Sequence, residues 1–448
     1  MIGKLITRVV DICRGAWSQF QALRCVHRKN VAEIEAYQFR ELKRLIDFAW
    51  EHIPFYRRYW EQYGFTPEKF QQLQDLLLIP CIDKEIVRVH YEEMVPRGYK
   101  CHRLERVTSG GTTGLPLAFY INQAIAHGRE FIHQPWIYWR VCRYRLGVDK
   151  VVILRGARVD ERLLQQGIYW QRSYGYRGRG LLLSSFHLTE ATYESYMHEI
   201  RKESPKFIVT YPSSLTVLCT LMKKHNEAPW IGLRGAICSS EMVYDWQRQL
   251  VREVLGVEIY SFYGHSEKSV SAIPDSQHRM LFEPSYGYVE FLDEDSNPVN
   301  TIGEIAQVVS TGFQNYYMPF IRYQTSDYVR VGNCPPLGVT HVAQEIIGRA
   351  QDFVYDKDYN RLPFTCSDVV FWDISGIVAY QYLQYEAGKL LIHIEVDNTF
   401  VPESIQHIQV EAEQLFANCD IDVSLVDRIE RTTLGKFRYF IQTYYPLF

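Results

Sequence analysis

Apolar positions in the first part of the chain recur at the spacing of helices. In residues 1–24, basic residues are interspersed among apolar residues that share one face, namely Ile2, Leu5, Ile6, Val9, Cys13 and Trp17. This recurrence every three to four residues predicts an amphipathic helix. The helical pattern returns over residues 36–64, and Pro54 predicts a break there because proline disfavours helix in the residue before it.

From about Val151 the pattern changes to short apolar runs that alternate with helical stretches. Buried strands are predicted at Val151–Leu154 and Phe207–Thr210, and helices at Tyr193–Lys202 and Ser214–His225. Alternation of this kind favours layered α/β structure.

Strand-like runs dominate residues 286–331, at Tyr288–Leu292, Glu304–Val309 and Tyr328–Val331. They predict a β subdomain that completes a large first domain. Beyond Gly348 the strands Leu390–Val396 and Val423–Val426 flank a helix near Ser404–Phe416, which predicts a compact α+β tail. We therefore expect a multi-domain α/β protein with a large domain over residues 1–347 and a small one over residues 348–448.

Composition excludes several classes of protein. The chain of 448 residues is too long for one ordinary core, and 47% hydrophobic with 23% charged residues is typical of a globular protein. A net charge of −3 gives no electrostatic case for binding nucleic acid. No run of about 18 apolar residues occurs, so no transmembrane helix is predicted.

No signal peptide is predicted, because charged residues interrupt the first apolar stretch and no small-residue cleavage site follows it. The cytoplasm is thus the expected compartment. The helix over residues 1–24 is expected to dock on the body of the protein. The alternative is peripheral contact with an anionic membrane surface.

Cysteines in this chain predict neither a disulfide framework nor a zinc site. The ten cysteines are scattered, without a CxxC pair. Those with apolar neighbours are expected to be buried free thiols; they are Cys13, Cys81, Cys142 and Cys219.

The run Val107–Pro116, read VTSGGTTGLP, is the strongest candidate for chemistry. Its glycines allow positive φ and close approach to a ligand, successive N–H groups can cradle an anion, and hydroxyls donate to phosphate oxygens. Alone, such a run is more often a surface turn. Its phosphate-binding interpretation depends on segments further along the chain.

Four later segments supply complementary groups. They are Gly235–Glu241 (GAICSSE), Ile259–Glu267 (IYSFYGHSE), Met318–Asp327 (MPFIRYQTSD) and Thr433–Arg438 (TLGKFR). Each has an ordinary structural explanation by itself, as core, cap, turn or solvated charge. In this order they match what ATP-dependent carboxylate activation needs: a phosphate loop, an aromatic plane, carboxylates for Mg²⁺ and ribose, and a mobile cation.

On these residues the chain resembles the adenylate-forming superfamily, and within it the phenylacetate–CoA-ligase-like branch and its capsule-biosynthesis-type (CapK-like) members. The resemblance also includes Ile53–Tyr56, Ile79–Lys84 and Gly348-Arg349, and it covers nearly the whole chain. It implies a large adenylation domain closed by a mobile C-terminal lid, with ATP, released as AMP, and Mg²⁺ as cofactors. The ordered set of matches is specific, whereas the glycine loop alone is weak.

The resemblance implies a role for each matching residue. The ATP phosphates would be bound by Ser109, Gly110, Gly111, Thr112, Thr113 and Gly114. Ser240 and Glu241 would line the adenine pocket, with Tyr263 stacking on the base. The nucleotide site would continue through Gly264 and His265.

The remaining matches would complete the chemistry. Ser266 would touch the α-phosphate, and Glu267 would hold the metal. Asp327 would bind the ribose hydroxyls, and Arg349 would contact the nucleotide near the hinge between the domains. Lys436 would stabilise the adenylation transition state.

The implied function is activation of a carboxylic acid as an acyl-adenylate, with release of pyrophosphate and transfer to an acceptor. The acceptor stays open between coenzyme A and an amine or hydroxyl in polysaccharide, O-antigen or capsule biosynthesis. By its position after the phosphate loop, the acid pocket is expected to include His133, Trp136, Tyr138 and Trp139.

The chain departs from the family pattern at three positions. Leu115 stands where many relatives carry lysine, Ser326 replaces the usual glycine, and Gln351 occupies the hinge position. These departures motivate an alternative function, a catalytically inactive nucleotide-binding scaffold in a polysaccharide-assembly complex.

Overall fold

The computed structural model describes residues 2–98, 104–108, 117–173, 180–349, 353–364, 370–371, 374–430, 438–442 and 444. These residues fall into two compact units. The first consists mainly of Met1–Asp149 and Tyr260–Ile346, and the second of Lys150–Ser173, Arg179–Ile259 and Ile347–Phe448.

The first unit begins with helices. They are α1 (Ile2–Val26), α2 (Val31–His52), α3 (Pro54–Gln62), α4 (Lys84–His90) and α5 (Gln123–Cys142), with 3-10 turns at Pro67–Lys69 and Leu73–Leu78. Asn30 begins α2 with a capping box: its side chain accepts from Glu33 N at 2.9 Å, and the Glu33 carboxylate accepts from Asn30 N at 3.1 Å. Pro54 separates α2 from α3 and occupies the first turn of α3, as its fixed φ allows.

Strands of the first unit form an antiparallel sheet segment and a separate hairpin. The hairpin is β1 (Glu105–Thr108) and β2 (Ala118–Ile121). The segment runs in the order β11 (Gly287–Leu292), β12 (Ile305–Gly312), β13 (Tyr323–Val331), β14 (Val342–Arg349), β10 (Met280–Phe282), β9 (Ser271–Pro274) and β8 (Ile259–Gly264). Every second residue of β13 is buried, as expected of a strand with one face on the core.

The second unit holds a mainly parallel sheet segment in the order β7 (Gly235–Ser239), β6 (Phe207–Thr210), β3 (Val151–Arg155), β5 (Gly180–Ser184) and β4 (Trp170–Ser173). Its helices are α6 (Glu161–Gln165), α7 (Tyr193–Glu203), α8 (Pro212–Lys224) and α9 (Asp245–Leu255). All four residues of β6 are buried, which is typical of a parallel strand covered on both faces.

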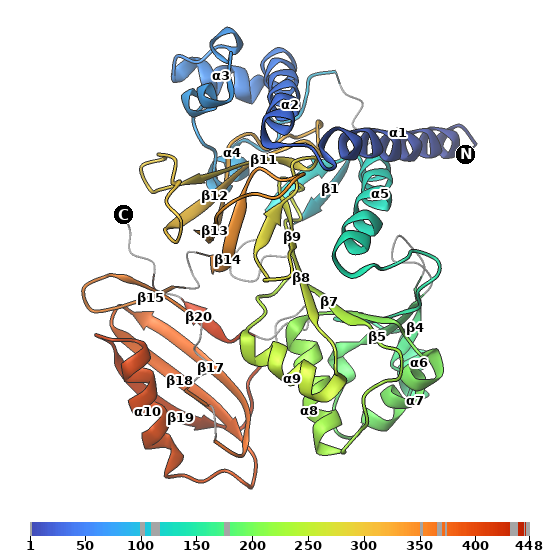
Figure 1. The fold of residues 1–448 in the computed structure, drawn as a ribbon, viewed down its shortest axis with the longest axis vertical. Coiled ribbons are helices and arrows are strands. Elements are labelled where there is room, and N and C mark those ends of the chain that lie inside the picture. Colours follow the sequence, from blue (N-terminus) through green and yellow to red (C-terminus); the bar gives the residue numbers. More distant parts are fainter. Residues whose placement is uncertain are drawn as a thin grey trace. The chain divides into compact units, whose positions relative to one another are not determined.

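The C-terminal part of the second unit is an α+β layer. Its sheet order is β19 (Asp420–Val426), β18 (Lys389–Val396), β17 (Ile377–Glu386) and β20 (Phe440–Gln442). A small hairpin precedes it, β15 (Phe353–Tyr355) with β16 (Arg361–Pro363). Helix α10 (Ser404–Leu415) lies along this sheet (Figure 1) and buries Ile408 and Ala412.

The predicted α/β class is confirmed, and so is each helix and strand named from the hydropathy pattern, to within a few residues at its ends. There are two exceptions: the helical region predicted from residue 36 begins five positions earlier at Val31, and the strand predicted at Tyr328–Val331 begins five positions earlier at Tyr323. The first half of this strand contains Thr325, Ser326 and Asp327, polar residues that look like a turn in the sequence.

Helix α1 packs against α5, and the two lie side by side in Figure 1. Two glycines permit this close approach. A Cβ on Gly15 would lie 2.1 Å from Ile125 O, and one on Gly128 would lie 2.0 Å from Ile12 O. Docking of the N-terminal helix on the body of the protein is therefore observed. None of the described helices is long and apolar enough to cross a membrane.

The burial predicted for four cysteines holds for two of them. Cys142 and Cys219 are buried, Cys81 is half-buried, and Cys13 is exposed. The prediction for Cys13 was wrong because the apolar face of α1 on which it lies points outward.

Candidate active site

Part of the predicted site lies outside the described residues. This applies to the phosphate loop, Ser109, Gly110, Gly111, Thr112, Thr113 and Gly114, and to Lys436. Arg349 ends strand β14, and its side chain is not described. The remaining predicted residues are placed.

A β-bulge in β13 determines where Asp327 points. Strand β12 pairs regularly with β13 except between Gln307 and Val309, where the register shifts. Thr325 holds the bulge, since its Oγ1 donates to Val308 O at 2.7 Å and accepts from Asp327 N at 3.1 Å. Ser326 takes φ +65°, a left-handed conformation that favours glycine. Bulges of this kind re-aim side chains at functional sites.

Three polar side chains converge at the end of β8. Tyr263 OH donates to Asp327 Oδ2 at 2.8 Å, and His265 Nε2 lies 2.6 Å from the same oxygen. Tyr263 OH and His265 Nε2 are 3.0 Å apart. The Asp327 carboxylate is almost entirely buried. Two sequence-predicted segments, residues 259–267 and 318–327, therefore meet as expected.

The turn after His265 carries Ser266, which is exposed, and Glu267, which is 7% exposed. Among the described residues, the Glu267 carboxylate has no hydrogen-bond or ion-pair partner. Gly264 pairs with Ser271 at the end of β8, which orients the turn. Lys268 follows at φ +60° and turns its side chain toward α5.

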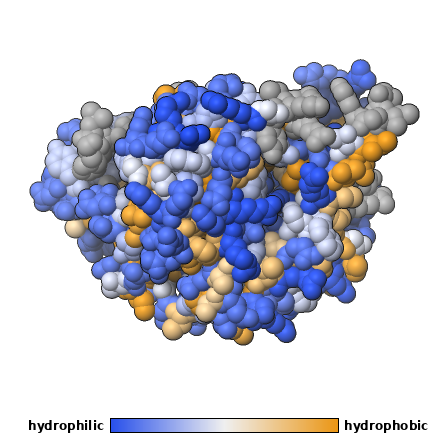
Figure 2. All heavy atoms as spheres, turned by 90° about the horizontal axis from the view of Figure 1, so that it is seen from above, coloured by the Kyte–Doolittle hydropathy of each residue, from blue (hydrophilic) through white to orange (hydrophobic). Residues whose placement is uncertain are grey.

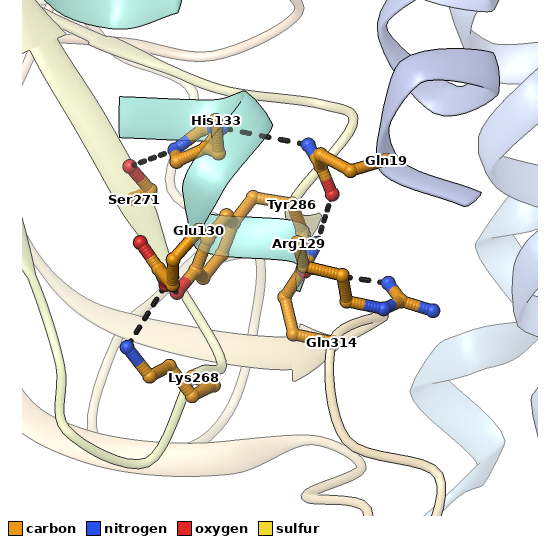
Figure 3. A network of polar contacts seen from close by, with 8 residues as sticks. All are labelled: Gln19, Arg129, Glu130, His133, Lys268, Ser271, Tyr286 and Gln314. Carbon is orange, nitrogen blue, oxygen red and sulfur yellow. Dashed lines mark hydrogen bonds and ion pairs between the residues drawn. The ribbon is translucent and has the colours of Figure 1, made fainter. Parts of the chain in front are cut away.

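A buried polar network anchors this turn to α5 and α1 (Figure 3). Lys268 Nζ donates to Glu130 Oε1 at 2.9 Å, and Tyr286 OH donates to the same oxygen at 3.0 Å. Burial by itself raises the pKa of Glu130, but Lys268 and His133 outweigh it and lower that pKa to about 2. Glu130 is therefore an ionised structural carboxylate.

His133 belongs to the same network. Its Nε2 lies 3.2 Å from Ser271 Oγ, and its Nδ1 lies 3.5 Å from Gln19 Nε2 on α1. Burial lowers the pKa of His133 to about 4, so the imidazole is neutral at pH 7. Gln19 accepts in turn from Gln314 Nε2 at 3.1 Å (Figure 3).

The four predicted pocket-wall residues of α5 point in different directions. His133 lies in the network, and Tyr138 is buried against Phe262 at 4.9 Å between ring centroids. Trp136 and Trp139 line a pocket of about 250 Å³ beside the end of α1. Three arginines share that lining: Arg28, Arg140 and Arg143.

In the second unit, the predicted adenine-side residues follow β7. Ser240 is exposed at φ +73°. Glu241 accepts from Ser213 N at 3.0 Å and Ser213 Oγ at 3.1 Å, which caps the first turn of α8. Its carboxylate therefore also has a structural role.

Two features of the site were missed by sequence reasoning. Arg155, at the carboxyl end of β3, donates to Ser239 Oγ at 2.7 Å, and its guanidinium lies 4.9 Å from the Tyr211 ring. The carboxyl ends of adjacent parallel strands are where open α/β sheets bind ligands, a position that the strand assignment could have indicated. The Lys268–Glu130 pair spans 138 positions, and no local pattern reveals it.

Comparisons with known proteins agree with this architecture. Residues 360–443 match the family model described as the CapK C-terminal domain. A phenylacetate-coenzyme A ligase of Thermus thermophilus is 27% identical over 403 residues, which is 84% of each chain. Protein CapK of Staphylococcus aureus is 20% identical over 374 residues, 81% of this chain and 79% of that protein.

Among solved structures, a 2-hydroxyisobutyryl-CoA ligase in the postadenylation state, in complex with R3-HIB-AMP, aligns with a TM-score of 0.74. It is 21% identical and the alignment covers 93% of this chain and 91% of that one, so it supports the fold. The relatives, the C-terminal match and the fold agree with the ordered motifs. Residues 360–443 thus match the CapK C-terminal domain, and the chain as a whole is similar to the adenylate-forming ATP-dependent carboxylate ligases, in their phenylacetate–CoA-ligase-like, CapK-like branch.

Proposed function

We propose that this protein condenses a carboxylic acid with ATP to form an acyl-adenylate and then passes the acyl group to an acceptor. The observation that carries the proposal is the bulge of β13, which directs Asp327 toward Tyr263 and His265. A buried carboxylate beside an aromatic ring suits a nucleoside: the ring offers a face to the base, and the carboxylate accepts from the ribose hydroxyls.

The first step needs no protein nucleophile. A carboxylate oxygen of the acid attacks the α-phosphorus, the bond from that phosphorus to the bridging oxygen breaks, and pyrophosphate leaves. Ser109–Gly114 would hold the departing phosphates, Ser266 would contact the α-phosphate, and Lys436 would offset the charge that develops there. Positioning and charge stabilisation then account for the catalysis.

Magnesium fits one observation of this site. The carboxylate of Glu267 is nearly buried and has no partner among the described residues, and Mg²⁺ at phosphates is typically held by one or two carboxylates with phosphate oxygens and water. The described residues contain no cluster of three or more His, Cys, Asp or Glu that could form an all-protein metal site. When bound, Mg²⁺ would neutralise phosphate charge.

On the adenine side, Ser240 and Glu241 would contribute through the backbone that follows β7, because the Glu241 side chain caps α8. Arg349 and residues 348–448 would form the hinge and lid that bring Lys436 to the nucleotide. Lid motions of this kind commonly limit turnover.

The acceptor is proposed to be coenzyme A or an amine or hydroxyl on a polysaccharide precursor. Two observations support these classes: the similarity to phenylacetate-coenzyme A ligases, and the match of residues 360–443 to the CapK C-terminal domain. Trp136 and Trp139, which line a pocket, are proposed to contact the acid. For His133 and Tyr138, both buried, we propose that they support that wall from behind.

Exchange of labelled pyrophosphate into ATP, screened over a panel of carboxylic acids, tests the proposal. With the best acid, Lys436→Ala should lower exchange on the order of 10²–10³-fold. Lys389→Ala, which alters an exposed lysine at the start of β18, is the matched control and should exchange normally.

Full exchange by Lys436→Ala would refute the role of this lysine. If no acid supports exchange or AMP formation while calorimetry still detects ATP binding, the protein is the inactive scaffold instead. The positive φ of Ser326, where the family pattern has glycine, is the observation in favour of that alternative.

A further inference from the structure

The apolar stripe of α1 is exposed along much of the helix. Its members recur every three or four residues and therefore share one face. Their exposed fractions are 59% for Ile6, 51% for Val9, 53% for Val10, 63% for Trp17 and 44% for Phe20, and Cys13 on the same face is exposed as well. A helix of a globular protein normally buries such a stripe.

The opposite face of α1 makes the internal contacts, and it is small and polar where it meets α5. Gly15 allows the two helices to touch, and Gln19 joins the buried network. Asp11 is buried and accepts from Asn122 Nδ2 at 3.2 Å. These contacts fix the rotation of the helix, so the apolar stripe is held outward by the fold.

The charged residues of α1 indicate what kind of partner the apolar stripe binds. Arg8, Arg14 and Arg24 are exposed, while Asp11, the one carboxylate in Ile2–Val26, is buried on the other face. The exposed surface of α1 therefore carries apolar and cationic groups without an anionic one. At the right-hand end of Figure 2, where α1 reaches the edge of the molecule, orange side chains lie at the surface beside blue ones.

We propose that α1 binds an anionic lipid bilayer surface, lying in the interface with Ile6, Val10, Trp17 and Phe20 inserted among the headgroups. Interfacial helices combine a strong apolar face with arginines that attract anionic lipids, and tryptophan favours that depth. The helix is long enough, at 25 residues, to lie along the surface for several turns. This inference does not depend on the reaction proposed above.

Co-sedimentation with vesicles tests the inference on the full chain. The protein should pellet with vesicles that contain phosphatidylglycerol and remain in solution with phosphatidylcholine alone. The triple variant Val10→Ser, Trp17→Ser, Phe20→Ser should bind on the order of 100-fold more weakly, because each exposed side chain contributes roughly fivefold when it enters the interface. Ile231→Ser, which alters an exposed apolar residue of the second unit, should bind normally.

An arginine variant separates the electrostatic attraction to anionic lipids from the contribution of the inserted apolar side chains. Arg14→Gln should weaken binding about fivefold, and added salt should weaken the wild-type protein in the same direction. Equal pelleting of the triple variant and the wild-type protein would overturn the proposal. Failure of the wild-type protein to bind anionic vesicles would overturn it as well. If light scattering then shows a dimer of the wild-type protein that the triple variant dissociates, the stripe is an interface between two copies of this chain.

Discussion

Replacing Lys268 by methionine removes the cation that faces Glu130 and leaves a carboxylate among buried groups. At a separation of 2.9 Å between Nζ and Oε1, the gross attraction is about 6 kcal/mol for an effective dielectric constant of about 20. The cost of desolvating both groups offsets part of it, and the Lys268 side chain is 28% exposed. We therefore expect Lys268→Met to lower the free energy of unfolding by about 2–3 kcal/mol.

A double-mutant cycle isolates this pair. Glu130→Gln removes the charge but keeps a group that can accept from Tyr286 OH. In Lys268→Met/Glu130→Gln no uncompensated charge remains, so the double variant should be destabilised by less than the sum of the two single variants, with a coupling of about 1–2 kcal/mol. Chemical denaturation at pH 7, followed by tryptophan fluorescence, measures all four proteins.

The control for the loss of a lysine is Lys43→Met, which removes a partly exposed i, i+4 pair with Asp47 and a hydrogen bond to Pro67 O, and should cost less than about 1 kcal/mol. Strict additivity of the two network substitutions would refute the reasoning, because it would mean that the charges at Glu130 and Lys268 do not interact. A loss for Lys268→Met no larger than that for Lys43→Met would refute it as well.

Three further predictions follow from the site. Asp327→Asn should raise KM for ATP roughly tenfold to 100-fold in pyrophosphate exchange, since it weakens charge-assisted hydrogen bonds; an effect no larger than that of the exposed Asp295→Asn would contradict the ribose assignment. Ser326→Gly should leave the free energy of unfolding unchanged or raise it by up to about 1 kcal/mol, as relief of the φ +65° strain exceeds the entropy cost of glycine; a clear loss of stability would contradict this. His133, with its pKa lowered from 6.5 to about 4, stays neutral in the folded protein while the unfolded chain takes up a proton, so its contribution should destabilise the fold by about 3 kcal/mol as pH falls from about 6.5 to 4. His133→Gln should flatten the denaturation profile in that window, and an unchanged slope would contradict the burial argument.

Periodicity in the sequence predicted the helices and strands well, because an element that is buried on one or both faces carries apolar residues at regular positions. The all-buried run Phe207–Thr210 and the helical run Tyr193–Lys202 correspond closely to β6 and α7. The pattern failed at the start of β13, because two of the buried positions there are occupied by the polar residues Thr325 and Asp327 instead of apolar ones. The bulge in β13 aims Asp327, so the misassigned end of the strand is also the end that carries the candidate site.

The candidate site likewise contains residues that the sequence identified and residues that only the structure revealed. Tyr263 and Asp327 were identified from ordered motifs, and the structure brings them within 2.8 Å. The aromatic residues of α5 were grouped by their position in the chain alone, whereas a helix distributes neighbours around its axis: Tyr138 packs on Phe262, and Trp139 lines the pocket beside the end of α1. Arg155 carries no motif, so only the sheet topology makes it a candidate.

By itself, the sequence determined the α/β class, the resemblance to adenylate-forming ligases and the order of the chemical groups, because these depend on local periodicity and on short segments of residues. Tertiary structure alone decided which carboxylates have partners: Glu130 with Lys268, Glu241 with the first turn of α8, and Glu267 with no partner among the described residues. It also decided the rotation of α1. An apolar periodicity predicts that a face is amphipathic, but the glycine contact with α5 and the buried Asp11 turn that face toward solvent.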